Sequence, residues 1–335
     1  MEIKHLKEEL AGRLEVETPR KLKVVFMPHF CLDNFLHVQE KPDTFFERMK
    51  GTAAHGGGNL AVPQRMGTGG KAANCASACA SLGLKAYLIA QTDELGYTLL
   101  EQLVKDGGMD ISHVGRSGNL AFTTTMELAG ANVMLSDPGS LARFGPERLT
   151  EEDEKLIAEA DFVCISDWGL NERATELARH VFKLVRNGGC GKTFFDPGDP
   201  SPKGEGSKES IEELVNEVIS QGLVDVLSVN EDEAERYGGM KKLKKHSRVD
   251  LHTTDYSVSY YDDRKTEKVP SFNVQPLRLT GAGDAWNAGD ILGEVMNLPH
   301  EKRLLLANAA AGYYISDPEG RHPTMAQLRE FLGSN

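Results

Sequence analysis

Short apolar runs alternate along this chain with longer stretches in which apolar positions recur at helical spacing. The runs are rich in Val, Ile, Leu and Phe and comprise residues 23–27, 86–90, 162–166, 192–196 and 224–229. Strands that are covered by helices on both faces read as nearly continuous apolar runs. The alternation therefore predicts an α/β fold with a doubly wound, mainly parallel sheet flanked by helices.

Two segments, about 32–66 and about 120–137, break this alternation. In the second segment, Thr123–Leu128 and Asn132–Leu135 flank Gly130 and predict a β-hairpin. We therefore expect both segments to be insertions in the α/β core.

The run Thr280-Gly281-Ala282-Gly283-Asp284 is the most informative candidate for chemistry. Small residues let successive backbone N–H groups turn toward one point and approach an anion closely. Residues 285–292 predict a helix whose dipole favours a phosphate oxygen at the same end. Asp284, at the first turn, can accept the proton of an attacking hydroxyl. The alternative is a tight turn in which Asp284 caps the helix.

A second glycine cluster, residues 67–74, leads into a predicted helix of very small residues that Gly83 closes. Small residues allow a ligand or a sheet to lie close. The spacing Gly67-x-Gly69-x-x-Ala72 matches a dinucleotide fingerprint loosely, but residues 62–65 look turn-like where such a site needs a hydrophobic strand. A dehydrogenase is therefore disfavoured, and the two clusters together suggest a phosphotransferase.

Several motifs in order make the chain resemble the ribokinase-like, or PfkB, carbohydrate and nucleoside kinases. Residues 69–76 with Leu82-Gly83 resemble the first family signature, and residues 280–289 resemble the second. The remaining matches are Asp33, the Asn-x-x-Glu element Asn230–Glu233, and the pair Asp93 and Gly96. Order and spacing agree from about Lys23 to Leu332.

The resemblance implies a single ribokinase-like kinase domain over residues 1–335, with a small β-sheet lid built from the segments 32–66 and 120–137. In some relatives the lid pairs two subunits, so a homodimer through the lid is expected as one possibility. Gly56-Gly57-Gly58 lies in the first segment and is either a hinge or a flexible surface loop.

By resemblance, the acceptor pocket holds Asp33, Gly69, Gly70, Lys71 and Asn74. Asp284 is the general base, and Gly281, Ala282 and Gly283 form the anion hole. The resemblance assigns nucleotide or phosphate contacts to Asn230, Thr254, Thr280, Gly281 and Gly283. Glu233 holds magnesium through water. The implied cofactors are Mg²⁺ and a nucleotide donor, ATP or ADP.

Each of these polar residues also has a purely structural interpretation. Asp33 and Asn74 can be helix or turn caps, and Lys71 a solvated helix start. Asn230 with Glu233 can cap a helix. Asp196, at the end of a predicted strand, faces the site or forms a turn. In the same region, Trp168 stacks on an acceptor or packs in the core.

Two departures from the family pattern concern the nucleotide donor and the monovalent cation that activates some relatives. Arg278-Leu279 stands where members commonly carry Asp-Thr, in a stretch that helps to build a monovalent-cation site in relatives. Potassium activation is therefore in doubt, and Arg278 is a candidate for a fixed positive charge or a bidentate phosphate contact. His252-Thr253-Thr254-Asp255 stands where a glycine is usual, which leaves ATP and ADP both open.

Composition narrows the function further. The net charge of -12 argues against nucleic acid, and the basic run 241–246 reads as a solvated helix end. The five cysteines, at 31, 75, 79, 164 and 190, lack a zinc spacing and suit a reducing compartment. With no long apolar run and a charged amphipathic start, the chain is expected to be a soluble cytoplasmic protein.

We therefore expect a kinase that transfers a terminal phosphoryl group to a hydroxyl of a sugar, sugar phosphate or nucleoside. The alternative is a non-catalytic nucleotide- or sugar-binding protein that keeps the kinase fold, which Arg278-Leu279 and the 252–255 loop favour. Asp284, Asn74 and Glu233 together speak against that alternative.

Overall fold

The computed structural model describes residues 3–16, 22–104, 108–189, 191–261, 264–278 and 280–334. Cys190 and Leu279 lie outside these residues. The main sheet of the described chain follows the order β14-β13-β12-β11-β10-β9-β1-β4, with β15 on β13. Its parallel strands are β4 (Lys85–Leu88), β1 (Lys23–Met27), β9 (Phe162–Ser166), β10 (Lys192–Asp196), β11 (Val226–Val229) and β12 (Arg248–His252).

One edge of the sheet turns antiparallel. β13 (Tyr256–Tyr261) runs against β12, and β14 (Arg264–Lys265) and β15 (Val269–Pro270) both pair with β13. The doubly wound, mainly parallel sheet expected from the apolar runs is thus confirmed. One run was assigned wrongly: residues 86–90 are divided between β4 and β5 (Ala90–Gln91), and β5 pairs with β6 (Val114–Gly115) in a separate ribbon.

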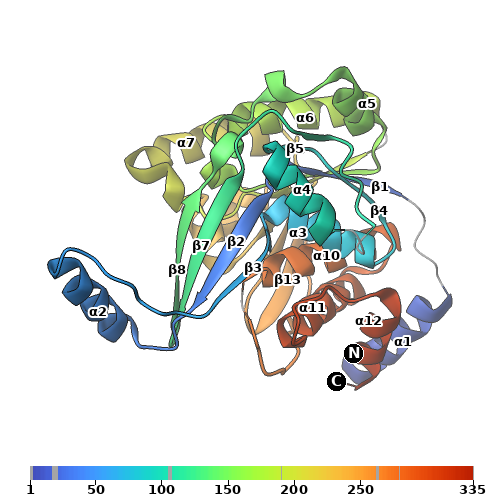
Figure 1. Ribbon diagram of the computed structural model, residues 1–335. Helices are drawn as coiled ribbons and strands as arrows, with labels where there is room; N and C mark the ends of the chain where they lie inside the picture. Colours follow the sequence, from blue (N-terminus) through green and yellow to red (C-terminus); the bar gives the residue numbers. More distant parts are fainter. Residues whose placement is uncertain are drawn as a thin grey trace.

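Helices cover both faces of the main sheet (Figure 1), and alternate residues of its buried strands belong to two different cores. Val24 and Phe26 of β1 pack in the core that holds α1 (Ile3–Val16), α3 (Lys71–Ser81), α4 (Glu94–Leu103), α10 (Ala282–Val295), α11 (His300–Ser316) and α12 (Met325–Ser334). Val25 and Met27 pack on the other face, against α5 (Glu151–Glu159), α6 (Ala174–Gly188), α7 (Ser207–Leu214), η5 (Val215–Ile219), α8 (Glu231–Arg236) and α9 (Met240–Leu243). Burial on both faces explains the continuous apolar runs.

The remaining short helices are 3₁₀ turns: η1 (Gly139–Arg143), η2 (Pro146–Arg148), η3 (Trp168–Leu170) and η4 (Ser201–Gly206). α1 and α12 lie side by side, so the two ends of the described chain are close (Figure 1). In the basic run 241–246, Lys241, Lys242 and Lys245 are exposed as expected. No helix of the described residues is long and apolar enough to cross a bilayer.

A second, four-stranded sheet has the order β3-β2-β7-β8. It comprises β2 (Cys31–His37), β3 (Gln64–Gly69), β7 (Ala121–Leu128) and β8 (Ala131–Asp137), and the hairpin expected around Gly130 joins the last two. The turn-like interpretation of residues 62–65 is wrong at Gln64 and Arg65, which begin β3. Both are exposed on an edge strand, so they lack the apolar alternation that marks a half-buried strand.

The connection between β2 and β3 contains α2 (Pro42–Ala54), which projects beyond the rest of the molecule (Figure 1). Phe45 of this helix packs with Val38, Met126 and Leu128 in a small separate cluster. Gly56 and Gly57, which follow the helix, have positive φ values of 85° and 107°. The structure thus contains both inserted segments, and their action as a lid stays a prediction.

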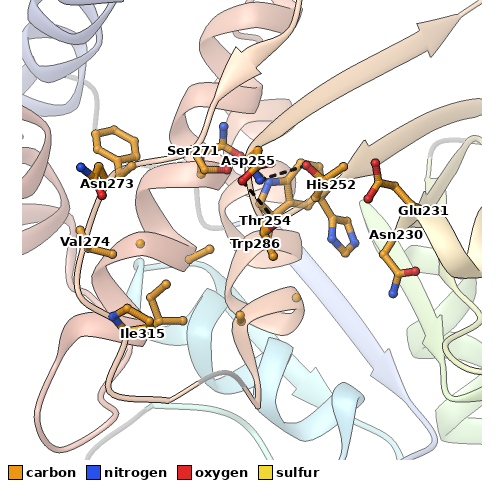
Figure 2. A pocket seen from close by; sticks show the side chains of 18 of the residues that line it. Asn230, Glu231, His252, Thr254, Asp255, Ser271, Asn273, Val274, Trp286 and Ile315 are labelled. Atoms are coloured by element: carbon orange, nitrogen blue, oxygen red, sulfur yellow. Dashed lines mark hydrogen bonds between the residues drawn. The ribbon is translucent and has the colours of Figure 1, made fainter. Parts of the chain in front are cut away.

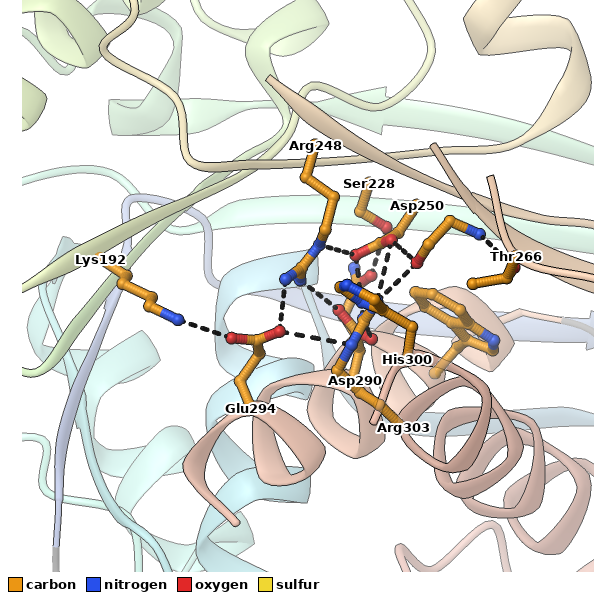
Figure 3. A network of polar contacts seen from close by, with 12 residues as sticks. Lys192, Ser228, Arg248, Asp250, Thr266, Asp290, Glu294, His300 and Arg303 are labelled. Atoms are coloured by element: carbon orange, nitrogen blue, oxygen red, sulfur yellow. Dashed lines mark hydrogen bonds and ion pairs between the residues drawn. The ribbon is translucent and has the colours of Figure 1, made fainter. Parts of the chain in front are cut away.

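A network of buried charges fixes α10 against α11 and the sheet (Figure 3). Arg303 of α11 has no exposed side-chain surface and donates to Asp250 of β12 at 3.0 and 3.1 Å and to Asp290 of α10. Arg248 donates to Asp250 at 2.9 Å and also pairs with Glu294. Opposite charges are thus in direct contact here and connect the second half of α10 to α11 and β12.

Candidate active site

Two helices begin at one place, beside the carboxyl ends of β9 and β10. α3 starts after Gly70, whose φ is 89°, and α10 starts after Gly281, whose φ is 86°. The Asn74 amide Nδ2 donates to Asp284 Oδ2 at 2.9 Å, although 210 residues separate the two in sequence. The structure therefore brings the two glycine clusters together into a single site.

Asp284 is a buried carboxyl group at the first turn of α10, only 5% exposed. Burial is the main cause that raises its pKa to about 7, and the nearby carboxylates of Asp196 and Asp167 raise it further. Lys71 and the hydrogen bond from Asn74 oppose this rise. A carboxyl group with a pKa near neutrality has the property that a general base needs.

The loop in front of Asp284 exposes the first backbone N–H groups of α10, which have no partner within a helix. Gly281 is required there because its φ is positive and because a Cβ would lie 2.6 Å from the Tyr314 hydroxyl oxygen. A Cβ at Gly283 would lie 3.7 Å from its nearest neighbour, His252 Cε1, which is an ordinary van der Waals contact. The N–H groups and the helix dipole together suit an anion.

Asp33 and Gly69 form a close pair across the second sheet. Asp33 of β2 is 5% exposed, and burial is the main cause that raises its pKa. A Cβ at position 69 would lie 2.2 Å from Asp33 Oδ1, so only glycine fits beside this carboxyl group. At position 70, a Cβ would lie 2.7 Å from the His29 carbonyl oxygen. These glycines allow the second sheet and the start of α3 to meet closely at the site.

Lys71 links the first helix to the end of β10. Its Nζ lies 3.1 and 3.0 Å from the two carboxylate oxygens of Asp196, and its side chain is 28% exposed. Lys71 is thus an ion-paired residue of the site and not a solvated helix start. Asp196 also accepts from Asn287 Nδ2 at 2.8 Å, so Asp196 faces the site.

Beside the loop 281–284 lies a cavity of about 940 Å³ (Figure 2), called the donor cavity below because the family resemblance leads us to expect the nucleotide near it. Val274 and Ile315 lie at one side of the view, and Asn230 and Glu231 lie at the other. Thr254 lines the cavity, and its contact with a nucleotide stays a prediction. The predicted residues Lys71, Asn230, Glu233, Ala282 and Gly283 line it as well. The cavity thus has apolar lining at Val274 and Ile315 and polar lining at Asn230 and Glu231, next to the loop 281–284. Apolar lining with a few polar groups suits a nucleotide.

Asn230 and Glu233 form a reciprocal capping box at the start of α8. Asn230 Oδ1 accepts from Glu233 N at 2.9 Å, and Glu233 Oε2 accepts from Asn230 N at 2.9 Å. Burial is the main cause that raises the pKa of Glu233 to about 7. The structural interpretation of the pair is therefore confirmed, and both residues still border the donor cavity.

The comparisons with known proteins identify the family of this chain. The chain is 27% identical over 289 residues to a 5-dehydro-2-deoxygluconokinase of Geobacillus kaustophilus, covering 79% of this chain and 84% of that relative. A model of the pfkB family carbohydrate kinases matches residues 52–326. The chain belongs to this family. It is thus a phosphotransferase with an alcohol group as acceptor.

Two further kinases are similar to most of the chain. A ketohexokinase of Haloferax volcanii is 24% identical over 297 residues, which cover 79% of this chain and 74% of that relative. The structure of an Arabidopsis thaliana ribokinase complexed with ribose and ATP superposes with a TM-score of 0.71 at 18% identity, covering 93% of this chain and 99% of the ribokinase. The structural likeness confirms the ribokinase-like fold.

Sequence reasoning missed three polar residues of this pfkB kinase. His29 contacts Asp167 through Nδ1, and Asp167 Oδ2 accepts from Lys71 N at 3.1 Å. Burial alone would raise the pKa of Asp167, but His29 and Lys71 outweigh burial and hold it below its ordinary value. Asn287, on α10, connects Asp196 to Ser228. The available signal was the position of Asp167 directly after an apolar run, where open α/β sheets bind ligands.

Two predicted contacts are placed differently in the kinase. Trp168 has no exposed surface, donates from Nε1 to Thr175 Oγ1 at 2.9 Å and packs edge-on against Tyr237. Stacking of Trp168 on an acceptor is therefore wrong, because core partners already cover its ring. Thr280 is not among the described residues that line the donor cavity, and its carbonyl accepts from the Tyr314 hydroxyl at 3.3 Å.

His252 fills the place where a glycine was expected. Its ring lies on Trp286 of α10, with centroids 4.8 Å apart, and borders the donor cavity. Burial is the main cause that lowers the pKa of His252 to about 4, so the imidazole is neutral at pH 7. A neutral imidazole can donate one hydrogen bond to a ligand in this cavity without adding charge.

Proposed function

We propose that this protein transfers the terminal phosphoryl group of a nucleotide, ATP or ADP, to a hydroxyl of a sugar, sugar phosphate or nucleoside. The hydrogen bond between Asn74 and Asp284 carries the proposal. It joins the acceptor side of the site to a buried carboxyl group whose pKa is about 7, directly beside the anion-binding loop. The names of the curated relatives, which are kinases of sugar-type molecules, support a sugar-like acceptor.

In the proposed reaction, the acceptor hydroxyl attacks the terminal phosphorus in line with the bond to the leaving nucleotide. An oxygen–phosphorus bond to the acceptor forms, and the bond from that phosphorus to the nucleotide's bridging oxygen breaks. The hydroxyl proton passes to the Asp284 carboxylate. The N–H groups of residues 281–284 stabilise the charge on the phosphoryl oxygens, because they are oriented before the reaction begins.

The acceptor is held by groups that hydrogen-bond to hydroxyls. Asp33 and Asn74 can accept from and donate to a polyol, and Gly69 and Gly70 let it approach the backbone. The wall that carries Asp33 and Gly69 belongs to the second sheet. Closure of this sheet as a lid would exclude water that otherwise hydrolyses the phosphoryl group. Hinging at Gly56–Gly58 and dimerisation through the lid remain predictions.

The donor side fits a magnesium ion that the nucleotide brings with it. Glu233 and Asn230 present oxygen atoms beside the donor cavity, and oxygen is the ligand that Mg²⁺ prefers. Among the described residues, no group of three or more His, Cys, Asp or Glu side chains is placed to hold a metal ion. Glu233 would therefore bind the ion through water, and the ion would neutralise the phosphate charge.

The test is a nucleotide-release screen with magnesium, ATP or ADP, and a panel of sugars, sugar phosphates, inositol and nucleosides. Asp284→Asn is the matched variant, because it keeps the size and the hydrogen bond from Asn74 but removes the base. We expect acceptor-dependent turnover in the wild type and a loss of about a hundredfold or more in kcat in the variant.

Two outcomes would contradict the proposal. If Asp284→Asn has the same kcat as the wild type, Asp284 is not the general base. Nucleotide binding without turnover on any acceptor would favour the non-catalytic binding protein, which the altered residues Arg278 and His252 make the second candidate.

A further inference from the structure

Three backbone carbonyl oxygens converge on the guanidinium of Arg278. Nη1 donates to the carbonyl oxygens of Tyr314, at 3.1 Å, and of Asp317, and Nη2 donates to that of Pro318 at 3.0 Å. These carbonyls lie at the C-terminal end of α11, which finishes at Ser316. The last carbonyls of a helix lack partners within it and form the negative end of its dipole. A positive charge is favourable at this end of α11, and Arg278 provides one.

The chain is closely fitted around this guanidinium. Gly320 has a φ of 71°, and a Cβ there would lie 2.8 Å from Arg278 Cζ. The Gly320 N–H donates to the Asp317 carbonyl at 3.2 Å, which closes the turn over the side chain. The guanidinium also lies 5.7 Å from the centroid of the Tyr314 ring. The turn that holds Arg278 therefore depends on a residue without a side chain.

The same cluster lies directly behind the anion-binding loop. The Tyr314 hydroxyl donates to the Thr280 carbonyl at 3.3 Å, and a Cβ at Gly281 would lie 2.6 Å from that hydroxyl oxygen. The Leu277 N–H donates to the Ile315 carbonyl at 2.7 Å, on the same turn of α11. Arg278 and Tyr314 thus hold the backbone on which Gly281 and the start of α10 depend.

These residues do not fit the monovalent cation that the family resemblance implies. Potassium sites in proteins use rings of backbone carbonyls that replace the hydration shell of the ion. Here the converging carbonyls already accept from a guanidinium that is charged at every physiological pH. A second cation at these oxygens would meet a like charge within a few ångströms, which is unfavourable.

We propose that Arg278 is a built-in cation, a positioning residue that holds the anion-binding loop and makes the kinase independent of potassium and other monovalent ions. The inference rests on the proposed kinase function, since it concerns how the loop is held for phosphoryl transfer. Its physical basis is that the charge is covalently attached, so its occupancy does not depend on the salt in solution.

The experiment compares KCl, NaCl and choline chloride at equal ionic strength, with thermal unfolding and steady-state kinetics as two readouts. The wild type should have the same unfolding temperature, kcat and nucleotide KM in all three salts. Arg278→Ala opens the carbonyl cluster and removes charged hydrogen bonds, so kcat/KM for the nucleotide in choline should fall by about tenfold or more. Potassium should restore part of this loss and raise the unfolding temperature of that variant.

Two further variants make the test specific. Arg278→Lys keeps a positive charge and should stay independent of potassium. Arg321→Ala removes an exposed arginine that pairs with Asp317 and Glu319 on the same loop, and it should behave as the wild type. If Arg278→Ala does not fold, the wild type and Arg278→Lys still test the inference, because their unfolding temperatures and kinetic constants can be compared in the three salts.

The inference is overturned if potassium activates or stabilises the wild type relative to choline. It is also overturned if Arg278→Ala merely unfolds at a lower temperature, with wild-type kinetics and no response to potassium. Failure of the proposed function looks different: no acceptor gives turnover in any salt, while the unfolding temperatures still report whether potassium binds.

Discussion

The two halves of α10 each lie beside a buried acidic group, and the two groups differ in the direction of their pKa shift. At the first turn, Asp284 is buried and its pKa is raised to about 7. Behind the second half, Asp250 of β12 is fully buried and its pKa is held well below its ordinary value. Burial alone would raise both pKa values, since desolvation disfavours the charged form. The partners therefore decide the outcome.

Asp250 has cationic partners in direct contact. It accepts hydrogen bonds from Arg303 and Arg248, and Ser259 donates to it as well (Figure 3). Asp284 accepts from the neutral amide of Asn74, while Lys71, the cation that lowers its pKa, is paired with Asp196. Paired charges connect one half of the helix to its neighbours, whereas at the other half an incompletely compensated carboxylate takes up a proton more readily.

The largest effect should follow from breaking the paired cluster. Arg303→Met leaves the carboxylates of Asp250 and Asp290 buried with one partner fewer, and we expect a loss of about 3–5 kcal/mol in the free energy of unfolding. Urea unfolding measures it. Arg321→Met is the control, because that exposed arginine should contribute at most about 1 kcal/mol. An equal loss in the two variants would show that the buried cluster does not hold α10.

The pH dependence of turnover should come next in size. Asp284 must be deprotonated to act as a base, so kcat/KM should be level above its pKa of about 7 and fall with decreasing pH below it. The fall should be about tenfold per pH unit, or about 2.7 kcal/mol over two units.

A matched variant separates Asp284 from Glu233, whose pKa is also about 7. Glu233→Gln should keep the fall at low pH if Asp284 causes it, and the residual activity of Asp284→Asn should lack it. A profile that becomes level in Glu233→Gln would assign the fall to Glu233 and contradict the role of Asp284.

A smaller effect is expected when the hydrogen-bond partner of the Asp284 carboxyl group is removed. Asn74→Ala removes the hydrogen bond that lowers the pKa of Asp284, so that pKa should rise and the fall in kcat at low pH should move to higher pH. We expect a displacement of up to about one unit, or about 1.4 kcal/mol. The kcat profile is measured at saturating acceptor, because Asn74 is also predicted to bind it. Ser81→Ala, at the far end of α3, should leave the profile in place, and an unmoved profile in Asn74→Ala would contradict the expected coupling.

Much of the main sheet was predictable, because burial on both faces leaves a local signature in the sequence. β1, β9 and β10 coincide with apolar runs, whereas the exposed edge strand β3 has no such pattern and was not predicted. The positive φ of Gly281 and the helix start that carries Asp284 were predictable for a similar reason, since both depend on adjacent residues.

The missed residues depend on contacts that are distant in the sequence. His29 and Asp167 meet because β1 and β9 are neighbours in the sheet, with Val24 beside Phe162 and Met27 beside Ile165. Nothing near either residue in the sequence specifies that neighbour. The small residues of α3 predicted a close approach but not which element approaches.

The sequence by itself determined the alternation of strands and helices, the two glycine-marked helix starts and the class of chemistry. Each of these depends on local backbone freedom or on burial, which neighbouring residues encode. Only the tertiary structure decided the charge state of Asp284 and the partners of Arg278. Electrostatic free energies depend on which charges and dipoles lie within a few ångströms, and folding brings those groups together from distant parts of the chain.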